Sequence, residues 1–131
     1  MAVYLLFQFF KNLNKKMKMI IAIIRPNRLV AVKDALNEGG FSGITVMAVK
    51  GRGSQKGIVE HYRGGEYKID FLDRVEVKVV VEDEEQDKVI KAITNAAKTN
   101  ELGDGKIFVL NVEQAIRIRT NETGAAALEK Q

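Results

Sequence analysis

The order of the predicted elements in this 131-residue chain indicates an α+β fold, with a four-stranded antiparallel sheet and two helices on one of its faces. Two observations and one rule of chain topology lead to this prediction. Four short apolar segments rich in β-branched residues have the length of strands. Two segments with helical spacing follow the first and third of them, so strand, helix, strand occurs twice. Right-handed crossovers of two such units give the ferredoxin-like plait, βαββαβ.

The first unit begins with the apolar run of residues 18–24, KMIIAII, which predicts a strand buried on both faces. Asn27 is the predicted N-cap of the helix that follows. Gly39 and Gly40 supply a left-handed stop, and residues 44–50, ITVMAVK, form a second apolar strand. The apolar residues of the helix recur at helical spacing: Leu29, Val32 and Leu36.

The second unit begins with the alternating strand of residues 75–81. Residues 82–85 are acidic and open a helix, where carboxylates suit the positive end of the helix dipole. A turn at 102–105 leads to the fourth strand, residues 106–112. The tail from Asn121 is small and polar, and we expect it to be mobile. The buried stripe of the helix is formed by Val89, Ile93, Ala96 and Ala97.

The length and composition fit a single domain with a substantial core, since 46% of the residues are hydrophobic. The net charge of +4 and the pI near 9.3 favour anionic partners without identifying one. The absence of cysteine excludes disulfides, thiolate zinc sites and cysteine nucleophiles. We expect a cytoplasmic protein.

The first ten residues are almost all apolar, yet this run is about half the length of a membrane span. Lys11, Lys15 and Lys16 follow it, on the wrong side for a signal peptide. One interpretation is a dispensable extension or a start assigned too early; the alternative is an interfacial anchor or a helix that docks on the body. The predicted divisions are an extension, a domain and a tail: residues 1–16, 17–120 and 121–131.

Residues 49–72 are polar and lack the period of a helix or strand, which predicts a long functional loop at about 53–71. The apolar strands pose a second question. Two helices cover only one face of a sheet, so something else must bury the other face. We therefore expect subunits to associate through the sheet.

Glycine-rich segments offer the main signs of a ligand site. Residues 51–57 place exposed backbone beside Arg52 and Lys56, which suits an anion. A second glycine turn at 103–106 precedes a strand, and arginines alternate in 116–119. These features fit either a polyphosphate site or ordinary turns and a solvated strand. No catalytic set is evident, because the sole histidine, His61, lies in the polar loop.

Three segments resemble the PII family of nitrogen-regulatory signal proteins: residues 62–67 (YRGGEY), 99–109 (TNELGDGKIFV) and 116–120 (IRIRT). The resemblance covers residues 17–120. It implies a ferredoxin-like homotrimer, which would bury the second face of the sheet. It also implies nucleotide sites between subunits that distinguish ATP from ADP, and binding of 2-oxoglutarate only together with Mg-ATP.

The resemblance further implies the roles of single residues. Thr45 and Val80 would face the adenine, and Tyr67 matches a loop tyrosine that some members have nucleotidylated. Gln55 would also help to hold Mg. The implied effector pocket is Gln55, Lys56, Gly57 and Arg74. The implied nucleotide-binding residues are Thr45, Gly53, Ser54, Gln55, Val80, Gly103, Asp104, Gly105, Lys106, Arg117 and Arg119, the two arginines reaching phosphates from across the cleft.

Three positions depart from the family pattern. Ser54 stands where many members have arginine, Arg74 where lysine is usual, and Gly65 replaces another small residue. The first change removes a phosphate contact. The second keeps a cation that can pair with a carboxylate in a different geometry.

The functional expectation is a non-enzymatic signal protein whose long loop controls a target of nitrogen metabolism. The candidate targets are an ammonium transporter, which would recruit the protein to the membrane, glutamine synthetase or a transcriptional regulator. No nucleic-acid partner is expected. The alternatives are an RNA-binding plait, which needs stacking aromatics on two central strands, and a small trimeric phosphohydrolase, for which a general base is missing.

Overall fold

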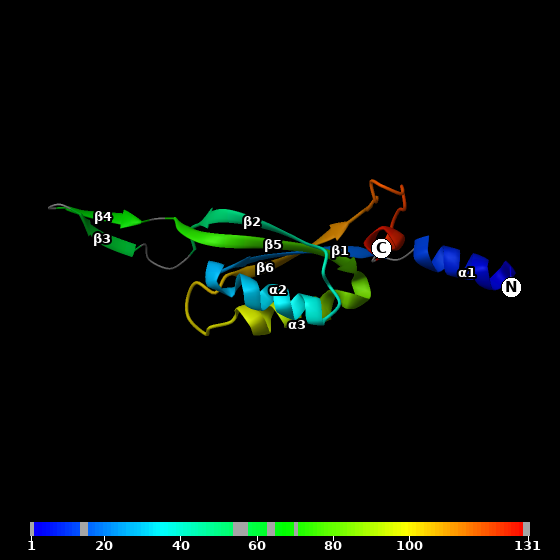
Figure 1. The fold of residues 1–131 in the computed structure, drawn as a ribbon, viewed down its shortest axis with the longest axis horizontal. Coiled ribbons are helices and arrows are strands. Elements are labelled where there is room, and N and C mark those ends of the chain that lie inside the picture. The colour runs from blue at the N-terminus through cyan, green and yellow to red at the C-terminus, as the bar shows by residue number, and fades with distance from the viewer. Residues whose placement is uncertain (1, 14–15, 54–57, 63–64, 70, 130–131) are drawn as a thin grey trace.

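A four-stranded antiparallel sheet forms the centre of the computed structural model, which describes residues 2–13, 16–53, 58–62, 65–69 and 71–129. Its strands lie in the order β2 (Ile44–Gly51), β5 (Leu72–Glu82), β1 (Met17–Ile24) and β6 (Lys106–Val112). Helices α2 (Leu29–Glu38) and α3 (Gln86–Ala97) lie together on one face of it (Figure 1). The predicted ferredoxin-like fold is confirmed.

The core lies between the sheet and these two helices. Alternate residues of the central strands point into it, because successive side chains of a strand face opposite sides of a sheet. Ile20 and Val77 are fully buried there against Leu36 of α2 and Val89 of α3. The predicted helical stripes therefore form the contact with the sheet.

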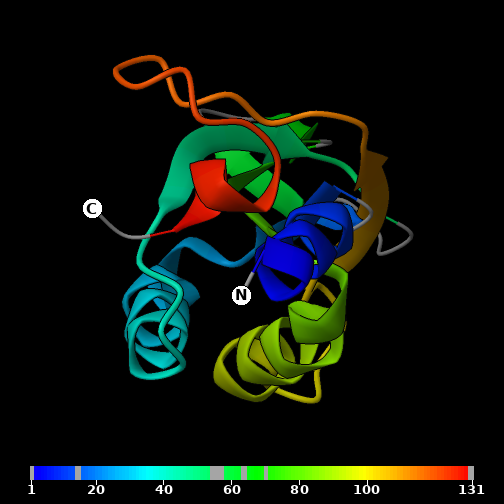
Figure 2. The same ribbon diagram turned by 90° about the vertical axis from the view of Figure 1, so that its right-hand side faces the viewer.

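The other face of the sheet carries a second set of apolar side chains. Met19, Ile21 and Ile23 of β1 alternate with the core residues and are only half-buried. On the flanking strands, Met47 is 50% exposed and Leu110 is 46% exposed. We call this surface the open face. Figure 2 shows the segment after β6 crossing one end of the sheet on the side away from α2 and α3.

Helix α2 begins differently from the prediction. Pro26 starts a 3-10 turn, η1 (Pro26–Arg28), in which the Arg28 backbone N–H donates to the Arg25 carbonyl at 3.0 Å. Asn27 lies inside this turn and does not cap the helix, so that prediction was wrong. The fixed φ of Pro26 favours the tight turn. At the other end, Gly40 has φ +90°, which confirms a left-handed stop there.

The polar segment predicted to be a loop contains a hairpin. Strands β3 (Ile58–Tyr62) and β4 (Gly65–Ile69) pair from Ile58 opposite Ile69 to Tyr62 opposite Gly65. The hairpin extends away from the body at one end of the long axis (Figure 1). The prediction of a segment without strands was wrong because the alternation that reveals a strand reflects packing of one face against a core, and this hairpin projects away from the core.

Strand β5 also begins earlier than predicted, since Leu72 already pairs with Gly51. Before α3, the acidic residues form a 3-10 turn, η2 (Asp83–Glu85). The helix itself starts one turn later than the sequence indicated.

The C-terminal tail, which the sequence did not predict to contain regular structure, forms a bridge and a short helix in the described residues. Ile116 and Thr123 form an isolated bridge, and a short helix, α4 (Ala125–Leu128), follows. Ala125 is only 4% exposed. The remaining helix, α1 (Ala2–Leu13), lies at the end of the molecule opposite the hairpin (Figure 1).

Candidate functional site

The ends of all four strands of the sheet meet at the base of the hairpin. Gly51 pairs with Leu72, Ile24 pairs with Val75, and Lys106 pairs with Ile23. A pocket of about 480 Å³ opens there. The two predicted glycine-rich segments thus meet within one chain. The lining residues are Ile23, Gly51, Arg52, Gly53, Leu72, Arg74, Glu101, Leu102, Gly103, Asp104, Gly105, Lys106 and Phe108.

The turn before β6 depends on glycine. Gly103 and Gly105 have φ values of +97° and +104°, which L side chains rarely adopt. A Cβ on Gly105 would lie 1.7 Å from the carbonyl oxygen of Ile23. The turn therefore packs backbone against backbone at the end of β1.

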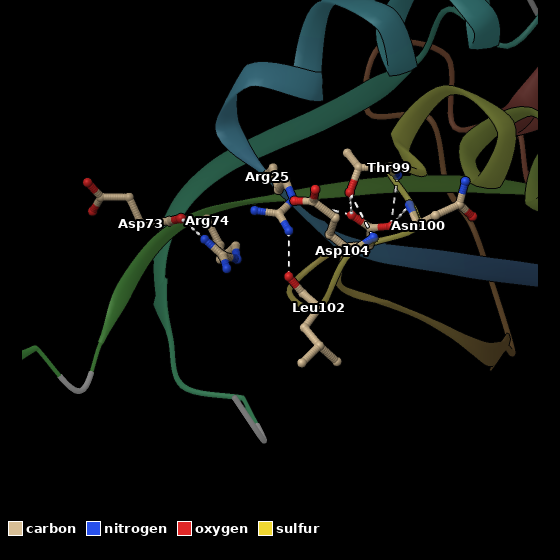
Figure 3. Close-up of polar contacts among 8 residues, drawn as sticks. Arg25, Asp73, Arg74, Thr99, Asn100, Leu102 and Asp104 are labelled. Atoms are coloured by element: carbon tan, nitrogen blue, oxygen red, sulfur yellow. Dashed lines mark hydrogen bonds and ion pairs between the residues drawn. The ribbon is translucent and has the colours of Figure 1, made fainter. Parts of the chain in front are cut away.

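Asp104 holds this turn in shape (Figure 3). Its carboxylate accepts hydrogen bonds from the backbone N–H of Thr99 at 2.8 Å and of Asn100 at 3.0 Å, and also from the Thr99 hydroxyl. Arg25 Nε lies 3.2 Å from the carboxylate, and Arg25 Nη2 donates to the Leu102 carbonyl at 2.6 Å. The hydroxyl of Thr99, ahead of the backbone and Arg25 bonds, holds the pKa of Asp104 well below its usual range.

These contacts refine the sequence-based expectation for Asp104. The carboxylate was expected in the nucleotide site, and Asp104 does line the pocket, but its hydrogen bonds to Thr99, Asn100 and Arg25 tie it to the turn and to the end of β1. Arg25 was not predicted as a site residue. No local motif marks it, because the chain between Arg25 and Asp104 is long.

Cations exceed unsatisfied acids around the pocket. Arg52, Arg74 and Lys106 line it, and Arg74 Nη1 donates to the Asp73 carbonyl at 2.8 Å. The two lining acids are Glu101 and Asp104, the second already paired with a guanidinium. The positive balance and glycine backbone favour an anionic ligand. Arg52 lies in the pocket as one of the cations that the sequence placed beside the glycine-rich segment. Phe108 was missing from the predicted site, although it follows from its alternation with Lys106 on β6.

Thr45 and Val80 lie elsewhere, on the open face. Thr45 pairs with Lys78, two residues before Val80, so the two are diagonal neighbours. At the rise of a strand, Thr45 lies about 20 Å from Gly51 and the pocket. Val80 lines a second pocket of about 370 Å³, which also involves Gly39 and α4.

The two predicted phosphate-binding arginines lie beyond the far end of β6. Arg117 Nη1 contacts Glu122 at 2.7 Å, and its Nη2 donates to the carbonyls of Ala127, at 3.3 Å, and Glu129. Arg117 is thus bound to the C-terminal segment of its own chain. Arg119 lies in the same segment and is exposed.

The structure does not describe the side chains of several predicted site residues. Ser54, Gln55, Lys56 and Gly57 lie outside the described residues. Of Tyr67, only its place in β4, opposite Glu60, is described.

The described part of the chain offers neither a cluster of metal ligands nor a membrane-spanning helix. It contains no group of three or more His, Asp or Glu that could hold a metal ion. None of its helices has the length and apolar character needed to cross a bilayer.

Comparison with known proteins gives the same family from a family model and from individual relatives. Residues 17–122 match the family model described as Nitrogen regulatory protein P-II. A protein of that name from Rhizobium meliloti (strain 1021) is 59% identical over 112 residues, which are 86% of this chain and 100% of the relative. Nitrogen regulatory protein P-II 2 of Methanothermobacter thermautotrophicus is 49% identical over 86% of this chain and 97% of its own length. The relative from Porphyra purpurea is 51% identical over 86% and 100%.

Proposed function

Because the chain belongs to the nitrogen regulatory protein P-II family, and is therefore a regulatory signal protein and not an enzyme, we propose that it senses ATP, ADP and 2-oxoglutarate. In this proposal the β3–β4 hairpin transmits the bound state to target proteins. The observation that carries it is the cationic pocket at the base of the hairpin, which joins the turn before β6 to the end of β2.

The phosphates of the nucleotide are proposed to bind at the glycine turn. Backbone at Gly53 and Gly103 leaves room for phosphate oxygens, Gly105 lets the turn pack against Ile23, and Lys106 supplies charge-assisted hydrogen bonds. Asp104 positions this turn through Thr99 and is not proposed as a direct phosphate contact.

The effector 2-oxoglutarate is proposed to bind beside the phosphates, where Arg74 lines the pocket. A guanidinium can pair bidentately with a carboxylate. Lys56, Gly57 and Gln55 would complete the effector site. Gln55, the nucleotide phosphates and the 2-oxo acid would hold Mg between them, so effector affinity would depend on the nucleotide. Both stems of the hairpin border this pocket, at Gly53 and Leu72, which couples occupancy to the hairpin.

The active assembly is proposed to be a homotrimer. Met47 and Leu110 leave apolar surface on the open face, which association would bury. In this trimer Arg117 and Arg119, which follow the far end of β6, would reach phosphates in the pocket of a neighbouring subunit. Arg117 would then exchange its contacts with the C-terminal segment of its own chain for the phosphates. Thr45 and Val80 would contact the adenine.

The proposed site of action is the cytoplasm. The proposed targets are an ammonium transporter, glutamine synthetase or a transcriptional regulator, and Tyr67 on the hairpin is a proposed modification site. An RNA-binding role lacks support, because neither central strand, β1 (MKMIIAII) or β5 (LDRVEVKVVVE), carries an aromatic residue for stacking on bases.

Calorimetric titration with 2-oxoglutarate tests the sensor. The purified protein is titrated alone, with Mg-ADP and with Mg-ATP. We expect measurable binding only with Mg-ATP; equal binding in all three would contradict the proposal. Mass measurement in native solution tests the assembly separately, and a stable monomer would rule out the trimer.

A further inference from the structure

Helix α1 lies outside the part of the chain that matches the family, which begins at residue 17. Four of its apolar residues recur at the helical spacing i, i+3, i+4 and i+7 and form one stripe, while Leu5, 63% exposed, lies outside it. The exposed fractions along this stripe are 81% at Val3, 55% at Leu6, 63% at Phe7 and 52% at Phe10. Large apolar side chains with this exposure indicate a surface that meets another apolar phase.

The helix points away from the body of its own chain. Figure 1 shows α1 continuing past the end of the sheet along the long axis. Next to the sheet, the Lys16 carbonyl accepts a hydrogen bond from the Asp83 backbone N–H at 2.9 Å, which fixes the point where the chain leaves the body. The stripe therefore lies past the end of the sheet and is largely exposed.

Charge distinguishes among possible occupants of this surface. Lys11, Lys15 and Lys16 follow the apolar stripe, and the sequence contains no acidic residue before Asp34. This charge attracts an anionic surface. It opposes the close packing of several copies of α1, because each copy carries the same positive charge. Tyr4, also on α1, is 63% exposed and is a residue type enriched at membrane interfaces.

The length of α1 decides how it could meet a bilayer. Twelve residues extend about 18 Å, which is too short to cross a hydrocarbon core of about 30 Å. An amphipathic helix of this kind lies in the plane of the interface, with its apolar side among the acyl chains and its cations at the headgroups.

We infer that α1 is a membrane-surface anchor that binds directly to anionic phospholipid. The stripe of Val3, Leu6, Phe7 and Phe10 enters the bilayer interface, while the positive charge of the sequence that follows the stripe attracts anionic headgroups. This inference does not depend on the nucleotide and effector sites proposed above, and it requires no transporter.

Vesicle flotation with the full chain tests the anchor. The probes are vesicles of phosphatidylcholine alone and of phosphatidylcholine mixed with phosphatidylglycerol. We expect binding to the mixed vesicles, weaker binding to the neutral ones, and a loss at about 1 M salt, where the screening length is about 3 Å. Binding to neither kind, or equal binding to both without an effect of salt, would overturn the inference.

Two matched variants separate α1 from general surface charge. Phe7 and Val30 are each 63% exposed and each lies on a helix, so Phe7→Glu and Val30→Glu make the same charge change. We expect Phe7→Glu to weaken binding to mixed vesicles about tenfold or more, because it removes an aromatic anchor from the interface. Val30→Glu should leave it within about twofold.

Equal losses in the two variants would show that α1 is not the anchor. A Phe7→Glu protein of lower native mass with unchanged vesicle binding would show that α1 joins copies of the chain, which also overturns the inference. Unchanged thermal unfolding in both variants is the check on folding, since both side chains are exposed.

Discussion

Replacing Gly105 by alanine tests the packing of the turn that forms the pocket. The new Cβ would lie 1.7 Å from the Ile23 carbonyl oxygen and 2.8 Å from its carbon. The residue also has φ +104°. A left-handed backbone costs an L residue about 1–2 kcal/mol, and relief of the overlap about 1–3 kcal/mol more. We expect a free energy of unfolding lower by about 2–5 kcal/mol.

Two other glycines divide this cost into its parts. Gly40 has φ +90°, and nothing lies within 4 Å of the place that a Cβ would take, so Gly40→Ala should show the backbone cost alone. Gly43 has open space and no positive φ, so Gly43→Ala should be nearly neutral or slightly stabilising. Thermal unfolding of the three variants at one protein concentration gives the comparison.

The expected order of melting temperatures is Gly43→Ala, then Gly40→Ala, then Gly105→Ala. For a chain of this length, Gly105→Ala should melt roughly 15 °C below the parent and Gly40→Ala roughly 5 °C below. If Gly105→Ala melts no lower than Gly40→Ala, the contact with Ile23 does not constrain the turn, and the proposed close packing is refuted.

Three further predictions concern ligand, acid and assembly. Lys106→Ala should weaken the binding of ATP, measured by calorimetry, about tenfold, since a charged hydrogen bond contributes about 1.5–3 kcal/mol. Lys33→Ala on α2 should leave the affinity for ATP unchanged. Equal affinities in the two variants would remove Lys106 from the site. Because the pKa of Asp104 is lowered in the folded chain, its contribution to stability is present above its ordinary pKa of 3.8 and is lost as pH falls below it. Thermal unfolding between about pH 5 and pH 2 should therefore depend less on pH in Asp104→Asn, and an unchanged dependence would contradict this. Leu110→Glu on the open face should reduce the native mass to that of a monomer, and Val30→Glu should not; an intact trimer in both would exclude the open face as the interface.

The sequence predicted the parts of the fold that have a buried face. The alternation of Val75, Val77, Val79 and Val81 reflects one side of β5 against the helices, and the helical stripes have the same origin. The hairpin and α4 were not predicted. The hairpin projects away from the core, which therefore imposes no pattern on it, and the short Ala-rich α4 depends on its contact near β5.

The candidate site was predicted unevenly for a similar reason. Glycine turns and nearby cations are local features, so Gly53 and Lys106 could be identified from the chain alone. The bond between Arg25 and Asp104 joins residues far apart in sequence, and only the folded register brings them together. Likewise, the sequence did not indicate that Arg117 is bound by the carbonyls of its own C-terminal segment.

The opposite placement of α1 and the hairpin restricts the geometry of any complex at a membrane. Strand β5 alone spans about 33 Å between the two ends of the sheet, and five further residues of hairpin add about 15 Å. Because α1 runs along the long axis in Figure 1, a bilayer that holds α1 in its plane would have the long axis upright only after a turn between α1 and β1, and the hairpin tip would then stand about 50 Å above the lipid. A target reached in that posture would be a protein in the aqueous phase. Capture by a transporter in the same membrane would instead require the molecule to tilt or to release α1. Binding to lipid and binding to a transporter would therefore favour different orientations of the molecule.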